Sequence, residues 1–530
     1  MSGTDWTPWP QEFAERYRKE GLWAGRPFGE LLNGWAKERG ERTAVVAPDH
    51  RWSYADLDRR ADRLAAGLHK AGIKAGDHVV VQLPNLAEFV ALLFALFRLG
   101  ALPVIALPAH RRSEIRYFCE FTEAVALFVP DVHQGFDHRE LAAEMLAEVP
   151  SLRHVFVAGD PGPFTALAGA DADPLPLPPR DPGELALLLL SGGTTGVPKL
   201  VPRTHDDWYY SGRAVAEACD YDSSTVHLVT LPIAHNWTLT HGLMATFHAG
   251  GTLVLAPSAD PDVAFPIIAK ERVTDTGMVP GVALLWIEAT EWTDDDLSSL
   301  RQVTIGGTKL NPELAKRVEP ALGCRLQQAF GMAEGLCGFH RGTDPEEIRL
   351  VSQGLPVSPL DEVRVVDSAD RDVPPGEAGE LLARGPYTIR GYYRAPEHNT
   401  RAFTGDGFYR TGDVVRLLPT GHVVFEGRVK DQINRGGDKI AAEELENHLL
   451  AHPQVRDVAV VGLPDEVLGE RICACVIPRG DQPTLDDLVD FLVERGVAPY
   501  KLPDRLELME SFPLTGLGKV SKKDLVARLS

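Results

Sequence analysis

A loop of small and hydroxylated residues follows an apolar run near the middle of the chain, where residues 187–205 read LLLLSGGTTGVPKLVPRTH. Glycine lets backbone N–H groups converge on phosphate oxygens, and hydroxyl groups add donors or a ligand for Mg²⁺. The loop therefore indicates a polyanion site, and a flexible surface loop is the alternative interpretation. Its candidate residues are Ser191, Gly192, Gly193, Thr194, Thr195, Gly196 and Lys199.

This loop does not follow the Walker A pattern, in which Gly and Lys are adjacent and precede Ser or Thr. Val197 and Pro198 separate Gly196 from Lys199. The sequence thus excludes a P-loop NTPase, and the surrounding elements must explain how an anion would be held.

Short apolar runs alternate with helix-like stretches along much of the chain. This alternation predicts an α/β fold with largely parallel sheets. Residues 351–428 read instead as short β-like pieces separated by Gly and Pro turns, which indicates a smaller β subdomain. The predicted strands of the α/β part are 78–83, 126–130, 154–159, 227–231, 252–257 and 302–307.

Two segments read as boundaries. Residues 159–184 are rich in Pro, Asp and Gly and are predicted to link two α/β halves. A second seam is expected around residues 427–439, followed by helices at 441–452 and 485–496 and a strand at 471–478. This last part is predicted to be a separate unit, either a movable lid or simply a second domain.

Composition narrows the class of protein. The chain has 530 residues, of which 44% are hydrophobic, so it can bury large cores. Its net charge of −21 argues against a nucleic-acid partner held by a broad basic surface. Six cysteines are too few for a disulfide scaffold and show no zinc spacing, so a reducing cytoplasm is expected.

The sequence also bears on membrane and export signals. Residues 1–21 lack the charged-then-apolar pattern of a signal peptide. The most apolar region, residues 89–109, is interrupted by Arg98, Gly100 and two prolines, so it cannot form one membrane span. We expect it to form a buried helix that leads into a buried strand.

Four further motifs follow the loop in a fixed order: FGMAEG at 330–335, YRTGD at 409–413, GRVKDQI at 427–433 and TGLGK at 515–519. Together the five motifs resemble the adenylate-forming ligase superfamily, which includes acyl-CoA synthetases, luciferases and adenylation domains of nonribosomal peptide synthetases. Within it, AHNW, RGPYTIRGYY and KDQINRGGDKIAAEE are most similar to stand-alone enzymes that activate 2,3-dihydroxybenzoate or salicylate.

The resemblance implies a fold and a reaction. A large N-terminal domain, residues 1–429, would hold two α/β subdomains and the β subdomain. A mobile α+β domain, residues 430–530, would turn about Lys430. A carboxylate would attack the α-phosphate of ATP in the presence of Mg²⁺ and release pyrophosphate, and a thiol would then take the acyl group. An aryl carboxylate is ionised at pH 7, so the first step needs charge neutralisation rather than a general base.

The resemblance also assigns roles to the motif residues. The loop would hold the departing phosphates, with Lys199 supporting it, and Glu334 would bind Mg²⁺. Ala333 stands where the family often has Thr, which leaves one hydroxyl contact to the α-phosphate open. Lys519 would be the catalytic cation between carboxylate and α-phosphate. The adenosine contacts would come from Gly307, Ala329, Phe330, Asp413 and Arg428.

The class of acid substrate is predicted from the residues that follow the apolar run at 227–231. Amino-acid-activating relatives place Asp where this chain has Asn236, next to His235. A neutral amide cannot balance an α-ammonium but can hydrogen-bond an ortho hydroxyl or amino group, which favours an aryl acid. His235 would be a gate for the thiol. The other predicted acid contacts are Thr240, His241, Thr308, Cys337 and Lys519.

Alternatives stay open at this point. The acid could be 2,3-dihydroxybenzoate, salicylate, 3-hydroxyanthranilate, benzoate or a hydroxypicolinate. The expected acceptor is the phosphopantetheine thiol of a separate aryl carrier protein, with coenzyme A as the alternative. A noncatalytic nucleotide-binding protein of the same fold is the third reading. Neither a nucleic acid nor a membrane is expected as a partner.

Overall fold

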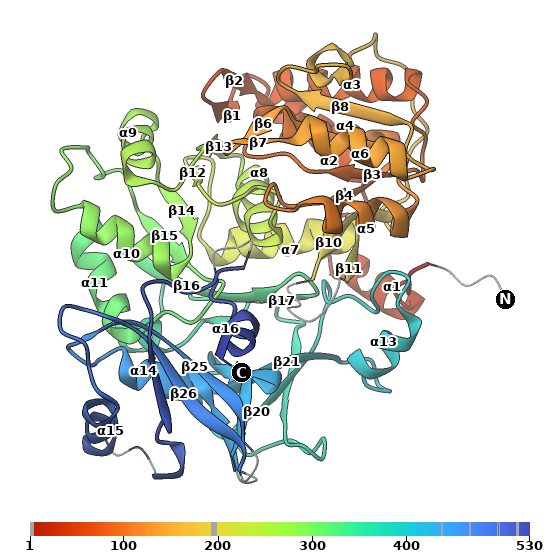
Figure 1. Cartoon of the computed structure of the whole chain (residues 1–530). Coiled ribbons are helices and arrows are strands. Elements are labelled where there is room, and N and C mark those ends of the chain that lie inside the picture. Colours follow the sequence, from red (N-terminus) through yellow and green to blue (C-terminus); the bar gives the residue numbers. More distant parts are fainter. Residues whose placement is uncertain are drawn as a thin grey trace.

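Two large sheets form the body of the protein (Figure 1). The computed structural model describes residues 5–191, 199–435, 438–465, 468–495, 497, 499–515 and 519–529. One sheet has seven strands in the order β11 (Leu200–Thr204), β10 (Leu185–Leu190), β4 (Leu102–Ile105), β3 (His78–Val81), β5 (Ala126–Pro130), β8 (His154–Ala158) and β9 (Thr165–Ala166).

The second large sheet has nine strands, and its middle strands run parallel. Their order is β18 (Leu355–Pro356), β17 (Gly335–Phe339), β16 (Arg325–Met332), β15 (Gln302–Ile305), β14 (Asp275–Met278), β12 (Val226–Val229), β13 (Thr252–Leu255), β1 (Thr43–Ala47) and β2 (His50–Ser53). All six strands predicted from apolar runs are present, which confirms the α/β class.

The predicted linker interpretation of residues 159–184 is wrong. β10 and β11 follow this segment, yet they join the same seven-stranded sheet as β3, β5 and β8 before it. The segment crosses α3 (Tyr54–Lys70), where Ala172 N donates to Arg63 O at 3.0 Å. A Cβ at Gly67 would lie 1.4 Å from Ala170 O, so only glycine admits this crossing. The Pro-rich composition therefore reflects an extended path over a helix rather than a domain boundary.

The apolar region near residue 90 forms the predicted helix and strand. α4 (Ala87–Leu99) is buried nearly all round, and Gly100 ends it with φ 77°, a left-handed conformation that favours glycine. β4 follows after two residues. Among the residues that the structure describes, no helix is both long and apolar enough to cross a membrane.

Two smaller sheets follow in the second half of the chain. The first has the order β19 (Glu362–Val366), β20 (Ala378–Arg384), β21 (Tyr409–Leu417) and β22 (Val423–Arg428), and it is the predicted β subdomain. The second contains β24 (Asp438–Ala441), β23 (Gln432–Arg435), β26 (Gly469–Pro478), β25 (Val455–Asp465) and β27 (Arg505–Leu508). The short 3₁₀ turn η3 (Val429–Asp431) joins them. The boundary at residues 429 and 430 and the hinge at Lys430 stay predictions.

Helices cover the sheets. In the N-terminal half they are α1 (Gln11–Lys19), α2 (Phe28–Arg39), α5 (Arg112–Thr122), α6 (His138–Glu148), α7 (His205–Ala218) and α8 (Ala245–Ala249), with the π-helix η2 (Thr238–Met244) before α8. The remainder are α9 (Pro261–Glu271), α10 (Pro280–Ala289), α11 (Pro312–Leu322), α12 (Glu346–Val351), α13 (Pro396–Ala402), α14 (Ala442–Leu449), α15 (Leu485–Glu494) and α16 (Lys522–Leu529).

Candidate active site

One cleft of about 3010 Å³ collects the predicted site residues. β14 and β15 are parallel, so the residues that follow them, Val279 and Gly306, meet at the same sheet edge and line the cleft. Every predicted site residue whose side chain the structure describes lines it: Ser191, Lys199, His235, Asn236, Thr240, His241, Gly307, Thr308, Ala329, Phe330, Glu334, Cys337, Asp413, Arg428 and Lys519.

Some predictions cannot be placed. Gly192, Gly193, Thr194, Thr195 and Gly196 lie outside the described residues, and the side chain of Lys430 is also not described. The two ends of the loop are described: Ser191 N donates to Lys199 O at 2.9 Å, and Lys199 N donates to Ser191 Oγ at 3.1 Å. These two bonds close the base of the loop between β10 and β11.

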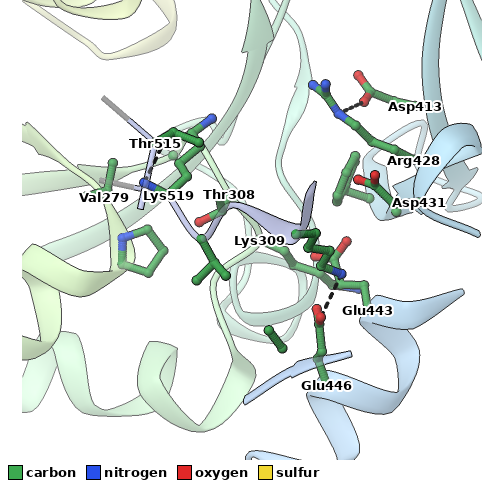
Figure 2. A pocket seen from close by; sticks show the side chains of 18 of the residues that line it. Val279, Thr308, Lys309, Asp413, Arg428, Asp431, Glu443, Glu446, Thr515 and Lys519 are labelled. Carbon is green, nitrogen blue, oxygen red and sulfur yellow. Dashed lines mark hydrogen bonds and ion pairs between the residues drawn. The ribbon is translucent and has the colours of Figure 1, made fainter. Parts of the chain in front are cut away.

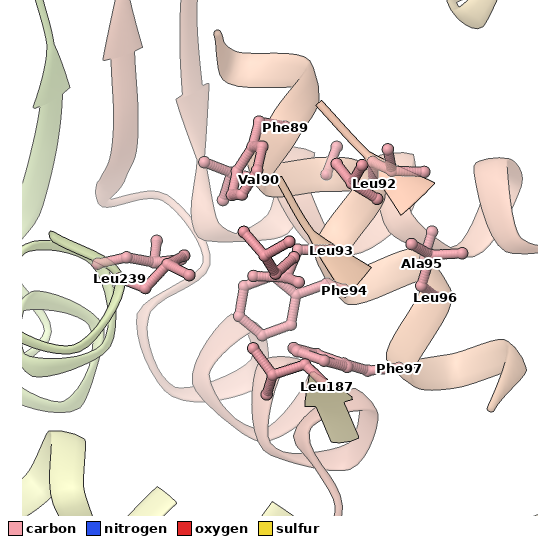
Figure 3. Packing of buried hydrophobic residues seen from close by; sticks show 14 of the residues in the cluster. Phe89, Val90, Leu92, Leu93, Phe94, Ala95, Leu96, Phe97, Leu187 and Leu239 are labelled. Carbon is pink, nitrogen blue, oxygen red and sulfur yellow. The ribbon is translucent and has the colours of Figure 1, made fainter. Parts of the chain in front are cut away.

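The buried core packs α4 against two segments that carry cleft residues, β10 and the π-helix η2 (Figure 3). Leu187, on the strand that leads into the loop, and Leu239, in the π-helix after Asn236, belong to one cluster with Phe94 and Phe97 of α4. The same packed helix therefore supports the strand that leads into the predicted anion loop and the π-helix of the predicted acid pocket.

An ion pair with a buried carboxylate and a partly exposed guanidinium marks the predicted ribose site (Figure 2). Asp413 and Arg428 are register partners on β21 and β22, and Arg428 Nε lies 2.9 Å from Asp413 Oδ1. Burial raises the pKa of Asp413 to about 6, although Arg428 opposes the shift. The carboxylate is therefore held in place, and Arg428, whose side chain is 38% exposed, keeps one face towards the cleft.

Lys519 reaches the cleft from the C-terminal part of the chain (Figure 2). A Cβ at Gly307, where φ is +87°, would lie 3.9 Å from Lys519 Nζ and 3.4 Å from Val279 Cγ1. Lys519 N donates to Thr515 Oγ1 at 3.3 Å, which ties the backbone of the lysine to Thr515. Burial lowers the pKa of Lys519 to about 8, with Arg428 adding to the shift.

Glu334 lies in the turn between β16 and β17 and is 5% exposed. Tyr392 Oη donates to Glu334 Oε1 at 2.7 Å, and the hydroxyls of Tyr392 and Tyr409 are 2.9 Å apart. Ile389 N donates to the backbone oxygen of Glu334 at 2.7 Å. These contacts hold the carboxylate at the wall of the cleft.

Arg203 supports the same turn from behind. Its Nη1 donates to Ala333 O at 3.2 Å, and its Nε donates to Asp207 Oδ1 at 2.7 Å, with both side chains 2% exposed. Asp207 also caps α7 through Thr204. The residue before Glu334 is thus tied to a buried ion pair.

The possible metal ligands around Glu334 fit one mode of Mg²⁺ binding. Among the described residues, no group of three or more His, Cys, Asp or Glu side chains could hold a metal ion. Mg²⁺ is often held by one or two carboxylates together with substrate phosphates and water. A single buried carboxylate in the same cleft as Ser191 and Lys199 fits that mode, so Glu334 could hold the ion with a bound nucleotide.

Asn236 stands at the start of a short hydrogen-bond chain. Thr240 Oγ1 donates to Asn236 Oδ1 at 3.4 Å, and Trp208 Nε1 donates to Thr240 Oγ1 at 3.2 Å. Thr240 therefore donates to the amide oxygen of Asn236 from the buried side. The Asn236 amide N–H₂ group is not used by any described side chain, so it can serve a ligand in the cleft.

His241 belongs to a buried relay that sequence reasoning did not find. Tyr221 Oη is 2.9 Å from His241 Nε2 and 2.9 Å from His227 Nδ1. Burial pushes the pKa of His241 well below its ordinary value and lowers that of His227 to about 3, so both rings are neutral at pH 7. These residues lie on different elements, and no local spacing connects them.

Trp237 also escaped prediction. Its ring is stacked on that of His241 at 5.7 Å with a 17° tilt. Cβ atoms at Gly306 and Gly277 would lie 3.4 and 3.5 Å from Trp237 Cζ2. The indole thus covers two glycines at the sheet edge and forms a flat wall, which suits an aromatic ring.

The remaining predicted acid contacts differ in burial. His235 is half-buried, and burial lowers its pKa to about 4, with Lys519 adding to the shift. Cys337 on β17 is also half-buried, and burial raises its pKa to about 12, so it is a neutral thiol. Thr308 is exposed at the rim, so it is less enclosed than the others.

Models of two known protein families match the sequence of this chain. The model of the AMP-binding enzyme family matches residues 32–393, and that of the AMP-binding enzyme C-terminal domain matches residues 444–519. The chain belongs to the AMP-binding enzyme family. This confirms the resemblance to adenylate-forming ligases that the five motifs indicated.

Individual relatives are similar along their whole length. The chain is 56% identical over 525 residues to 2,3-dihydroxybenzoate-AMP ligase of Bacillus subtilis, covering 99% of this chain and 97% of the relative. It is 48% identical to salicyl-AMP ligase / salicyl-S-ArCP synthetase of Mycobacterium tuberculosis, covering 98% and 94%. The apo structure of Mycobacterium smegmatis MbtA superposes with a TM-score of 0.77 at 46% identity, covering 99% of each chain.

Proposed function

We propose that this protein joins an aryl carboxylic acid to AMP and then passes the acyl group to the phosphopantetheine thiol of a separate aryl carrier protein. The observation that carries the proposal is one cleft that holds Lys519, the Asp413–Arg428 pair and the neutral Asn236 together. The names of the relatives, a dihydroxybenzoate-AMP ligase and a salicyl-AMP ligase that is also a salicyl-S-ArCP synthetase, support the same acid class and acceptor.

In the first step a carboxylate oxygen attacks the α-phosphorus of ATP, and the bond to the β-phosphate oxygen breaks. Lys519 reduces the repulsion between the two anions as they approach, and Asp413 holds the ribose hydroxyls. Phe330, a half-buried ring at the cleft wall, offers a face to the adenine. Mg²⁺, held by Glu334 with the triphosphate, would neutralise charge on the leaving pyrophosphate.

In the second step the thiol sulfur attacks the acyl carbonyl, AMP leaves, and the thiol proton passes to solvent. His235, half-buried at the cleft, is the residue we place at the thiol's entry. We also propose that residues 430–530 form the mobile domain and that the chain turns at Lys430 between the two steps. In this arrangement Lys519 serves only the first step.

The proposed recognition of the acid rests on two features of the pocket. The Asn236 N–H₂ group can donate to the oxygen of an ortho hydroxyl, because Thr240 already donates to the amide oxygen. An ortho amino group would instead donate to the second lone pair of that oxygen. Trp237 supplies a flat wall beside His241. A carboxylate at Lys519 and an ortho substituent at Asn236 would orient the ring along that wall.

An ATP–pyrophosphate exchange panel tests the proposal. Substituted benzoates, picolinates and amino acids would be compared, and exchange is expected with ortho-substituted aryl acids and not with α-amino acids. AMP release would then be measured with an aryl carrier protein and with coenzyme A alone. Exchange with none of the acids would leave a noncatalytic nucleotide-binding protein, and release with coenzyme A alone would make the protein an aryl-CoA ligase.

A further inference from the structure

Two basic side chains and a histidine lie together at the wall of the cleft. Lys199 Nζ stands 5.7 Å from the centre of the Tyr392 ring, and the His398 ring is 5.1 Å from the same ring. Arg401 follows His398 by one helical turn on α13 and also lines the cleft. Burial lowers the pKa of His398, and the charges of Lys199 and Arg401 add to that shift.

The position of α13 is fixed by the backbone of Tyr392. Asn399 Oδ1 accepts from Tyr392 N at 2.8 Å, and Asn399 Nδ2 donates to Tyr392 O at 3.1 Å. Tyr393 N donates to Leu200 O at 3.0 Å, which ties the segment before α13 to β11. The helix is therefore held beside Lys199 by three hydrogen bonds, and Arg401 is presented by a fixed scaffold.

The two cations lack acidic partners. Within the described residues neither Lys199 nor Arg401 forms an ion pair, although Glu397 stands four residues before Arg401 at a spacing that commonly pairs. Both side chains line the cleft, so their positive charges are available to an anion there. The acidic group fixed to the same tyrosine is Glu334, which accepts from the Tyr392 hydroxyl.

We propose that Lys199, His398 and Arg401 form a pyrophosphate site that holds the leaving group beside Glu334 before it is released. The inference rests on the proposed adenylation and adds α13 to the phosphate-binding part of the cleft. Arg401 supplies two donors in one plane for a phosphate group, Lys199 a second charge and His398 a ring N–H. Pyrophosphate moves here without a covalent bond being made or broken.

The test compares Arg401→Gln with the unchanged protein in ATP–pyrophosphate exchange. Loss of one charge-assisted contact is expected to raise the KM for pyrophosphate roughly ten-fold. The KM for the acid should not change, because the acid lies at the Asn236 end. Arg401→Lys should restore only part of the affinity, because lysine keeps the charge but not the two coplanar donors. Calorimetric titration of pyrophosphate with Mg²⁺, without ATP or acid, should show the same weakening.

Arg153→Gln is the matched control, because Arg153 is exposed at the start of β8 and does not line the cleft. It should leave the KM for pyrophosphate unchanged. The inference is overturned if Arg401→Gln leaves this KM and the calorimetric affinity unchanged, or if the KM for the acid rises equally. Absence of exchange in the unchanged protein would instead contradict the proposed function, so the two failures are distinguishable.

Discussion

The pKa values of two cleft residues predict a bell-shaped pH profile for adenylation. Lys519 has a pKa lowered by burial to about 8, so it carries its charge below pH 8 and loses it as pH rises. Asp413 has a pKa raised by burial to about 6, so it is ionised above pH 6 and neutral below. Because both charges are needed, kcat/KM for ATP should be highest between these values.

The size of each limb follows from the fraction of charged side chain. A group that titrates near pH 8 is about 90% protonated at pH 7 and about 10% protonated at pH 9, so kcat/KM should fall roughly nine-fold over that interval. The acid limb should fall by a similar factor between pH 7 and 5. His235 and His241 should add no limb above pH 5, because burial lowers the pKa of His235 to about 4 and that of His241 well below its ordinary value.

The assay is initial-rate pyrophosphate release at limiting ATP from pH 5 to 9, with each sample returned to pH 7 to confirm that activity recovers. Lys519→Ala should be slower throughout and should lack the alkaline limb, whereas Arg153→Gln should keep both limbs. A flat profile from pH 7 to 9 in the unchanged protein, or an alkaline limb that persists in Lys519→Ala, would refute the assignment of this titration to Lys519.

Three further predictions concern other parts of the chain. Lys519→Ala should reduce adenylation by roughly 10²- to 10³-fold and leave thiol capture of a supplied acyl adenylate intact. Lys430→Pro, which fixes φ and removes an N–H, should keep adenylation and impair thiol capture, and equal losses of both activities in both variants would contradict alternating domains. Asn236→Asp should weaken aryl acids by several kcal/mol, because a second carboxylate is placed beside the first; unchanged exchange would remove Asn236 from the acid site. Tyr221→Phe leaves two buried ring nitrogens unpaired, so it should lower the free energy of unfolding by about 1–3 kcal/mol for each nitrogen. Urea denaturation measures this loss, and Tyr210→Phe, which loses the single partner Ser358, is the control.

Local sequence patterns were enough to predict elements that are buried on all sides. α4 reads as helical and buried because nearly every side chain is apolar, and the strand at residues 126–130 is apolar on both faces, as a central parallel strand must be. The prediction that residues 159–184 link two halves was wrong because long-range strand pairing decides which strands share a sheet. The composition of this segment describes only the chain path, whereas the pairing of β10 with β4 depends on residues some eighty positions apart.

The site shows the same division. Asp413 and Arg428 could be named from motifs because each lies in a short recognisable run, but their register pairing across β21 and β22 required the structure. Tyr392, which links Glu334 to the basic groups on α13, lies in the quoted run RGPYTIRGYY, yet nothing in that run says that its hydroxyl faces a carboxylate 58 residues away. Hydrogen-bond partners of that kind are set by packing, so spacing cannot reveal them.

The hydrogen-bonded group of Tyr221, His227 and His241 limits which ring substituents the proposed acid pocket can recognise. Tyr221 has one hydroxyl proton and faces two neutral histidines, so it donates to one ring nitrogen and accepts from the other. When it donates to His241 Nε2, the N–H of that imidazole is at Nδ1; when it accepts from Nε2, Nδ1 is bare. His241 can therefore present a donor or an acceptor without any change of charge. We expect a pocket built in this way to discriminate ring substituents by hydrogen bonding at constant charge, with the substrate carboxylate at Lys519 as the charge that the proposed site binds.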